Sequence, residues 1–251
     1  MHKPLQGKTL ILTGSQKTTK VTDHIESLGG KAVVCPLIKT VELIQYNDEM
    51  YLKQFNNCDW LIFTSQNGVE AFCKKLKRYQ MDASHFSGKI AAVGEKTAQL
   101  LEENGFVVRF MPTIYSADVF VKEFPLVSGE NPSCLFIRGE RAKDTLRKYL
   151  PFPIIEWNVY TTAEDTRYID SLIETIQNNR SPIIIFASPS AVDCYAKYVV
   201  PSVGWGKTLI ASIGHVTTEA LHGYGATVTY QPEKYTMQSV IEEIVKGEVY
   251  N

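Results

Sequence analysis

The sequence predicts an α/β protein made of two similar parallel-sheet units, and two observations carry this prediction. Apolar runs typical of buried strands alternate with helical patterns along the chain, which indicates parallel sheets. One pattern also occurs twice: FTSQNGVEAF at 63–72 returns as FASPSAVDCY at 186–195, and VGEKTAQLLEENGFVVRFMP at 93–112 returns as IGHVTTEALHGYGATVTYQP at 213–232. Two such units in one chain imply a cleft between them.

Ten runs are typical of strands, most of them apolar throughout. They are KTLILT (8–13), KAVVC (31–35), DWLIFT (59–64), KIAAV (89–93), FVVRF (106–110), SCLFI (133–137), IIEWNVY (154–160), PIIIFA (182–187), TLIASI (208–213) and ATVTY (226–230). Helical patterns fill the intervals. They lie at 17–28, 67–79, 95–104, 117–124, 141–149, 167–178, 190–199, 216–223 and 236–246.

The repeat also predicts the domain boundaries. TLILTG at 9–14 resembles CLFIRG at 134–139, so each unit has two strands followed by three more. Between the second and third strands of each unit lies a stretch that can cross between lobes. We therefore expect one discontinuous lobe, a second continuous lobe and a linker of two segments. The first lobe is 1–37 with 163–251, the second lobe is 43–157, and the linker is 38–42 with 158–162.

Composition limits the functions that the chain can have. Its 251 residues are 44% apolar and 21% charged, with a net charge of −1, which excludes a broad electrostatic footprint for nucleic acid. The longest apolar runs, such as 182–187, are far too short to span a membrane, and the N-terminus has no signal-peptide core. Five cysteines without CxxC spacing indicate reduced thiols. We expect a cytoplasmic protein that binds neither nucleic acid nor membrane.

Several catalytic classes lack their motifs in this sequence. There is no GxxxxGK[ST] phosphate loop, no GxGxxG after the first strand, no HExxH and no GxSxG. The five histidines have no metal-like spacing. The sequence therefore predicts neither a cofactor nor a metal site.

Small hydroxyl residues recur where strands pass into helices. They are Thr13, Thr64, Ser65, Thr97, Ser188, Ser190 and Thr217. Each could simply cap a helix, because serine and threonine are preferred at that position. Together they lie at the carboxyl ends of strands, where doubly wound sheets bind ligands. Several helix N-termini converging on one crevice would suit a ligand with several carboxylates or phosphates.

Five segments of the sequence occur in the order and spacing of a known family. DWLIFTSQNGVEAF, AAVGEKTAQLLEENGFVVRFMP, NVYTT, IIIFASPSAV and SIGHVTTEAL resemble the motifs of the uroporphyrinogen-III synthases, over essentially the whole chain. The resemblance implies two flavodoxin-like doubly wound lobes joined by a two-stranded linker. It also implies a cofactor-free reaction on hydroxymethylbilane, a linear tetrapyrrole with eight carboxylates. The enzyme removes the terminal hydroxyl as water, and ring D is inverted through a spiro intermediate to give uroporphyrinogen III.

The resemblance also implies roles for individual residues. Tyr160, in NVYTT, matches the family's tyrosine and is the candidate general acid for the leaving hydroxyl; the competing interpretation is an aromatic plug at a lobe junction. Substrate binding is expected of the residues that line the family's cleft and of their neighbours. These are Thr13, Thr64, Ser65, Thr97, Ser188, Ser190 and Thr217.

One departure from the family concerns positive charge. The family often carries Thr-Arg after the first strand, whereas here Thr13 is followed by Gly14, so one expected cation is absent. Arg138, Arg141 and Lys143, after the strand in CLFIRG, are well placed to meet substrate carboxylates, although they could equally be surface charges.

Two further expectations follow from the family. The protein should act as a monomer and receive its substrate by transient handover from the preceding pathway enzyme. The competing function is a non-catalytic bilobal α/β protein that binds a polyanionic ligand.

Overall fold

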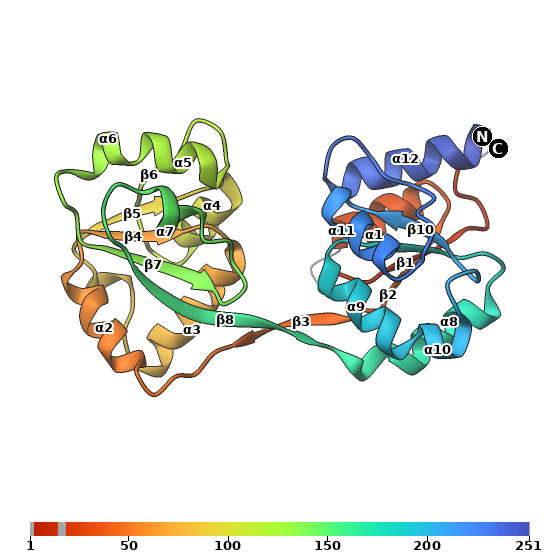
Figure 1. The fold of residues 1–251 in the computed structure, drawn as a ribbon, viewed down its shortest axis with the longest axis horizontal. Helices are drawn as coiled ribbons and strands as arrows, with labels where there is room; N and C mark the ends of the chain where they lie inside the picture. The colour runs from red at the N-terminus through yellow and green to blue at the C-terminus, as the bar shows by residue number, and fades with distance from the viewer. Residues whose placement is uncertain (1–2, 15–18, 251) are drawn as a thin grey trace. The chain divides into compact units, whose positions relative to one another are not determined.

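The computed structural model describes residues 3–14 and 19–250. It divides the chain into two compact units, which we call unit 1 (Met1–Lys39 with Ala163–Asn251) and unit 2 (Thr40–Thr162). The chain passes between the units twice, once within β3 (Ile38–Glu42) and once within β8 (Ile155–Glu164). These two strands are neighbours in the sheet order (Figure 1).

Unit 1 contains a four-stranded sheet in the order β10-β9-β1-β2, and its strand pairs are parallel. The strands are β1 (Thr9–Leu12), β2 (Lys31–Val34), β9 (Ile183–Phe186) and β10 (Leu209–Ser212). Three of them are apolar at nearly every position because both faces of the sheet are covered. Leu10 and Leu12 pack into one buried cluster, while Ile11 packs into another.

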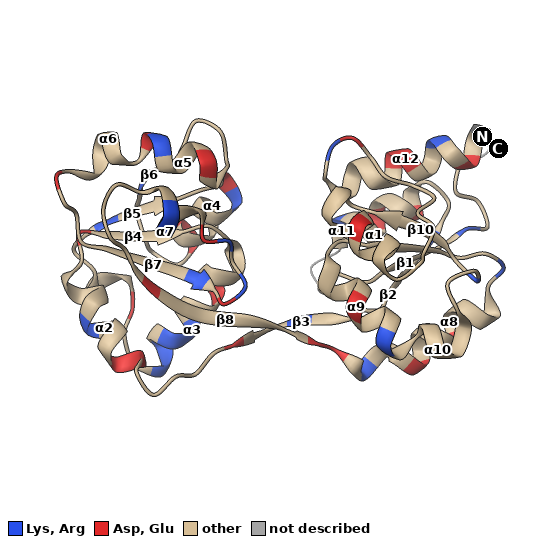
Figure 2. Ribbon diagram, viewed as in Figure 1, with Lys and Arg blue, Asp and Glu red and all other residues tan. Residues whose placement is uncertain are grey.

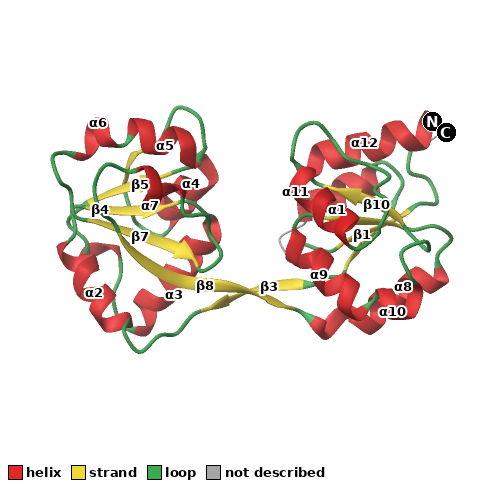
Figure 3. Cartoon of the chain, viewed as in Figure 1, coloured by secondary structure: helices red, strands yellow, loops and turns green. Residues whose placement is uncertain are grey.

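Helices cover both faces of this sheet (Figure 3). They are α1 (Thr19–Ser27), α8 (Ile169–Asn178), α9 (Pro189–Tyr198), α10 (Val200–Val203), α11 (His215–Gly223) and α12 (Met237–Tyr250), with a 3-10 turn η2 at Thr166–Tyr168. Ile25 of α1 and Ile244 of α12 pack with Leu10. Leu172 of α8 and Leu221 of α11 pack on the opposite face with Ile11.

Unit 2 contains a six-stranded sheet in the order β3-β8-β7-β4-β5-β6. Its other strands are β4 (Trp60–Phe63), β5 (Lys89–Ala92), β6 (Val108–Phe110) and β7 (Cys134–Gly139). Its helices are α2 (Asp48–Asn57), α3 (Gln66–Arg78), α4 (Glu95–Glu103), α5 (Ala117–Glu123), α6 (Pro125–Ser128) and α7 (Thr145–Tyr149), with a 3-10 turn η1 at Ala83–His85. The pairs β4–β5, β4–β7, β5–β6 and β7–β8 are all parallel. The predicted α/β class with parallel sheets is therefore confirmed.

Alternate residues of the unit 2 strands also face opposite sides. Leu61 and Phe63 join a cluster with Phe72 of α3, whereas Trp60 and Ile62 pack on the other face, which α5 and α7 help to cover. Charged residues of both signs are interspersed along both units (Figure 2). No helix among the described residues combines the length and apolarity that a bilayer crossing needs.

The strand predicted at 226–230 is wrong, because the structure contains only an isolated bridge between Ala211 and Tyr230. A side chain takes over part of the expected ladder: the Ile210 amide donates to Thr229 Oγ1 at 3.3 Å. The amides of Thr229 and Tyr230 both donate to the single carbonyl of Ile210. Unit 1 therefore has four strands and a bridge where the repeat predicted five strands.

The helices differ from prediction in several places, of which two change the element and one concerns undescribed residues. The helix predicted at 141–149 begins only at Thr145, because the Ala142 amide donates to the Gly139 carbonyl in a turn. Helix α2 was not predicted, since its first residue, Asp48, is a buried carboxylate that interrupts the apolar pattern. The first two residues of the helix predicted at 17–28 lie outside the described residues.

A buried ion pair explains the position of Asp48. Lys75 Nζ lies 2.6 Å from Asp48 Oδ2, and both side chains are essentially fully buried. Trp157 Nε1 donates to Asp48 Oδ1 at 2.9 Å, the Gln45 amide donates to Oδ2 at 3.1 Å, and Lys75 also donates to the Leu43 carbonyl. One network thus connects α2, α3, β8 and the segment after β3.

We predict that Lys75→Met lowers the free energy of unfolding of unit 2 by roughly 3–5 kcal/mol, because the Asp48 charge would stay buried without its partner. Urea unfolding followed by tryptophan fluorescence measures this. The double variant Asp48→Asn with Lys75→Met, which removes both charges, should recover most of the loss. A loss below about 1 kcal/mol in the single variant would show that the pair is not needed.

Candidate functional site

Tyr160 lies on β8 directly beside the end of β7. The register of these strands shifts between Arg138 and Gly139, so that Arg138 pairs with Asn158 and Gly139 pairs with Tyr160. The phenol ring lies across Gly139: a Cβ there would be 2.5 Å from Tyr160 Cζ and 2.8 Å from its Oη. Only glycine at 139 leaves room for the ring.

The phenol of Tyr160 is hydrogen-bonded to Ser65, the residue that caps α3. Ser65 caps this helix with extended backbone, and its Oγ accepts the Gly68 amide at 3.1 Å. Tyr160 Oη lies 3.1 Å from the same Oγ, and either hydroxyl can donate. When Ser65 donates, the phenol O–H stays free to donate to another group. This is the arrangement that a general acid requires.

Other predicted residues of unit 2 lie at the same edge of the sheet. Thr64 directly follows β4, and Thr97 follows β5 in the first turn of α4. Thr97 is only 5% exposed, and its side chain makes no hydrogen bond within the part of the chain that the structure describes. Its amide donates to the carbonyl of Gly94, the residue that caps the helix. Ends of adjacent parallel strands thus bring Tyr160, Ser65, Thr64 and Thr97 to one edge.

Arg138 is engaged within unit 2. It is 5% exposed, and its guanidinium donates to Asp144 at 3.1 Å, to Glu156 and to the Ala142 carbonyl. It precedes Gly139 by one residue, so it faces the side of the sheet opposite to the Tyr160 ring. These contacts hold the turn that follows β7, and they leave the guanidinium little capacity for a ligand.

The predicted residues of unit 1 fall into two groups. Thr13 is fully buried, and its hydroxyl donates to the Ile185 carbonyl at 2.7 Å, so it joins β1 to β9. Ser188 caps α9 and accepts the Ala191 amide at 3.4 Å, with Ser190 in the first turn of the same helix. Thr217 lies in the first turn of α11 and is 3% exposed. All except Thr13 follow strands β9 and β10.

The cysteines do not provide a nucleophile. Burial raises the pKa of Cys58 to about 12 and that of Cys134 likewise to about 12, while the pKa values of Cys73 and Cys194 reach about 11. Thiols with such values carry almost no thiolate near neutral pH. Among the described residues, no group of three or more histidine, cysteine or acidic side chains could hold a metal ion.

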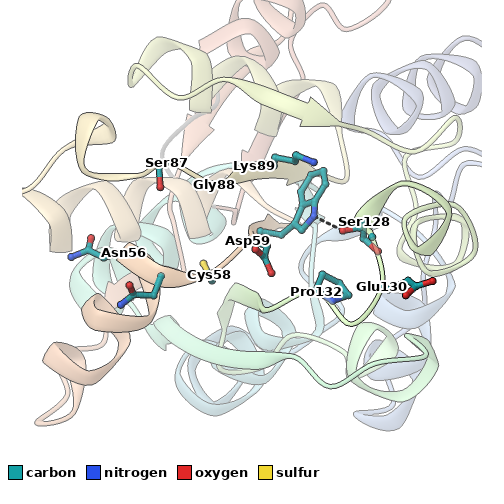
Figure 4. A pocket seen from close by; sticks show the side chains of 12 residues that line it. Asn56, Cys58, Asp59, Ser87, Gly88, Lys89, Ser128, Glu130 and Pro132 are labelled. Atoms are coloured by element: carbon teal, nitrogen blue, oxygen red, sulfur yellow. Dashed lines mark hydrogen bonds between the residues drawn. The ribbon is translucent and has the colours of Figure 1, made fainter.

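A hollow of about 630 Å³ lies at the opposite edge of the unit 2 sheet (Figure 4). It is lined near the amino ends of β4 and β5 by Asp59, Ser87, Lys89 and Glu130. The indole of Trp60 donates to the Ser128 carbonyl at 3.0 Å beside it. None of the predicted site residues lines this hollow, so the candidate site remains the edge that carries Tyr160.

Gly139 and Gly68 were missed by the sequence analysis. A Cβ at Gly68 would lie 3.3 Å from Ser65 Oγ, so this glycine lets the start of α3 approach the phenol. The repeat offered a signal for Gly139, because it ends CLFIRG as Gly14 ends TLILTG.

Comparison with known proteins identifies the family. The family model described as uroporphyrinogen-III synthase HemD matches residues 19–242. The uroporphyrinogen-III synthase of Synechococcus elongatus is 25% identical over 96% of this chain and 95% of its own length. The porphyrin biosynthesis protein HemD of Ruminiclostridium josui is also 25% identical, but this chain spans about half (51%) of that protein.

Solved structures agree on the fold. The uroporphyrinogen-III synthetase of Helicobacter pylori has a TM-score of 0.69 at 20% identity and covers 95% of this chain and 99% of its own. A mutant uroporphyrinogen III synthase of Thermus thermophilus has a TM-score of 0.59 at 17% identity, over 97% of this chain and 99% of its own.

Proposed function

Because the chain belongs to the uroporphyrinogen-III synthase family, we propose that it cyclises hydroxymethylbilane to uroporphyrinogen III, with Tyr160 as the proton donor. The family and the fold favour this activity over a non-catalytic binding protein. The observation that supports the role of Tyr160 is its hydrogen bond to Ser65, at 3.1 Å, at the start of α3.

The first step is loss of the terminal hydroxyl of the substrate. The phenol O–H of Tyr160 donates to this hydroxyl, which leaves as water, and an azafulvenium cation remains. The tyrosinate left behind recovers a proton from solvent, and ring closure later releases one proton, so the two transfers balance. The nearby N-terminus of α3 stabilises negative charge on the phenol oxygen, because its unpaired amides carry a partial positive charge.

The second step is attack on the azafulvenium by the substituted carbon of ring D. This gives a spiro-pyrrolenine, which fragments and recloses with ring D inverted. On reclosure the attacking α carbon of ring D loses a proton to solvent, which balances the proton that Tyr160 gave to the leaving hydroxyl. The protein must hold a flexible polyanion so that the hindered carbon is the one that attacks. We assign this holding to Ser65, Thr64, Thr97, Ser188, Ser190 and Thr217.

Two of the residues expected to bind substrate have structural roles in this proposal. Thr13 donates its hydroxyl to Ile185, and the guanidinium of Arg138 is bound to Asp144, Glu156 and Ala142. Charge complementarity to the eight carboxylates then comes mainly from helix N-termini rather than from Arg138.

We further propose that 38–42 and 158–162 form a two-stranded linker between flavodoxin-like lobes 1–37 with 163–251 and 43–157. The neighbouring positions of β3 and β8, each containing one of the two chain crossings, support this. We also propose that the protein is a cytoplasmic monomer. Because hydroxymethylbilane closes spontaneously to the uninverted ring, transient handover from the preceding pathway enzyme would protect it.

The isomer of the product tests the function. Freshly prepared hydroxymethylbilane should give mainly type III porphyrin with the protein, whereas spontaneous closure gives type I. Chromatography of the oxidised porphyrins measures the ratio. If only type I porphyrin formed, in the amount given by a blank without protein, the proposed activity would be refuted.

Tyr160→Phe should lower kcat by roughly ten- to a few hundred-fold, because the stabilised azafulvenium forms slowly even without the phenol proton. The residual product should remain type III, since other residues set the conformation of the bound substrate. The matched control is Tyr149→Phe, an exposed tyrosine on α7, which should keep full kcat. Full activity of Tyr160→Phe would refute the acid role, and type I product would make Tyr160 a positioning residue.

Gly139→Ala should displace the phenol, because its Cβ would lie 2.5 Å from Tyr160 Cζ. We expect a fall in kcat as large as that of Tyr160→Phe, with the free energy of unfolding changed by less than about 1 kcal/mol. The control is Gly206→Ala, where the new Cβ would meet nothing within 4 Å. Combining Gly139→Ala with Tyr160→Phe should add no further loss. Additive losses would mean that Gly139 acts independently of the phenol.

A further inference from the structure

A second tyrosine, Tyr235, is built into unit 1 at the carboxyl end of β10. Its ring packs against Gly214, the residue that caps α11: a Cβ at Gly214 would lie 2.6 Å from Tyr235 Cδ1 and 2.8 Å from Cγ. The next residue, Thr236, accepts the Ser239 amide at 3.1 Å through its hydroxyl. The Tyr235 ring thus lies on the glycine that begins one helix, and the chain directly after it is anchored at the start of another.

The repeat contains the same residue spacing in unit 2. Gly94 precedes Tyr115 by the same number of residues as Gly214 precedes Tyr235, and Ser116 caps α5 as Thr236 accepts an amide ahead of α12. The ring contact differs, because a Cβ added at Gly94 would meet only the Cβ of Tyr115, at 3.9 Å. The close packing of a tyrosine ring on the capping glycine is therefore a feature of unit 1.

Both tyrosine side chains are largely exposed. Tyr115 is 55% exposed and Tyr235 is 54% exposed. Tyr235 is additionally held by its hydroxyl, which lies 3.0 Å from His215 Nδ1, and the two ring centroids are 5.4 Å apart. His215 is itself exposed and begins α11. Glu95 occupies the corresponding position in unit 2, so the pair of a tyrosine with a histidine is specific to unit 1.

The pair presents hydrogen-bond donors whichever way its proton is placed. If the phenol donates to Nδ1, the neutral imidazole keeps its proton on Nε2 and can donate from there. If the imidazole is protonated, Nδ1 donates to the phenol oxygen, and both Nε2–H and the phenol O–H remain available. In either arrangement one donor, the phenol O–H or the Nε2–H, can reach an oxygen of a carboxylate, because Oη and Nε2 lie on opposite sides of Nδ1.

The start of α11 carries further polar groups. Thr217 follows His215 in the first turn of this helix and is only 3% exposed. Gly214 offers no side chain to cap the helix, so the first amides of α11 lack a side-chain acceptor.

We propose that Tyr235 and His215 form a subsite for one carboxylate of the substrate, with Tyr235 also offering its ring face to a pyrrole. This inference rests on the proposed function, because it names the tetrapyrrole as the ligand. The carboxylate accepts from the phenol O–H or from the imidazole Nε2–H and lies at the positive end of α11. Binding here should change affinity rather than bond breaking, because proton donation is assigned to Tyr160.

The test compares Tyr235→Phe and His215→Phe with the wild type. Each variant should raise KM for hydroxymethylbilane and Kd for uroporphyrinogen III by at least threefold, with about fivefold to twentyfold expected for one hydrogen bond to a charged group. The value of kcat should stay within twofold and the product should remain type III. His215→Gln, which keeps an amide donor, should recover part of the affinity.

The matched control is Tyr224→Phe. Tyr224 caps the other end of α11, is 48% exposed and donates to Asp193 at 3.0 Å, so it resembles Tyr235 in exposure and bonding. Its KM and Kd should not change. A rise below threefold in Tyr235→Phe and His215→Phe, or an equal rise in Tyr224→Phe, would overturn the subsite. A wild-type protein that yields only type I product would instead refute the proposed function.

Discussion

The buried pair of Asp48 and Lys75 is the interaction on which the geometry at Tyr160 depends. Lys75 lies in the last turns of α3, the helix that begins beside Ser65, and Trp157, which donates to Asp48, lies on β8 three residues before Tyr160. The same carboxylate thus binds the two elements that carry the two hydroxyls. Because a buried charge tolerates little displacement from its partner, α3 and β8 cannot slide past each other. The core of unit 2 thus holds Ser65 Oγ and Tyr160 Oη 3.1 Å apart.

The two units share a fold but differ at the position of the phenol. In unit 1 the strand register pairs Leu12 with Val34, and in unit 2 it pairs Ile137 with Trp157. Three residues beyond Val34 stands Leu37, which is fully buried, whereas three residues beyond Trp157 stands Tyr160, which is only partly buried. The register shift at Gly139 brings Tyr160 to its place, whereas β1 and β2 pair in an even register over their whole length. The repeat therefore gives two similar sheets, and local differences at one strand end place a partly buried phenol in unit 2 only at this position, where we propose proton transfer.

Much of this could be predicted from the sequence, for identifiable reasons. Fully buried strands such as β9 form continuous apolar runs, and duplicated motifs place Ser65 and Ser188 at equivalent helix starts. The roles of Thr13 and Arg138 could not be predicted, because their partners Ile185 and Glu156 come from strands that only the fold brings together. Helix α2 was missed because it begins with a buried carboxylate, Asp48, whose partner Lys75 lies 27 residues further along the chain. The segment 226–230 has the composition of a strand, but Thr229 uses its hydroxyl where a strand would use its backbone.

Two of the cations expected at the strand ends are not available to a polyanion. Arg138 is satisfied within unit 2, and Gly14 stands where the family often has arginine. Exposed lysines remain at the strand ends of unit 2, namely Lys96 in the first turn of α4 and Lys143 after β7. Hydroxyls, amides and helix N-termini add hydrogen bonds that are directional, whereas the field of a lysine is not. Directional contacts restrict how a flexible chain can lie, while point charges accept many conformations. Since the inverted product requires one particular folding of the tetrapyrrole, we expect the directional groups to contribute more to control of the isomer than the lysines do.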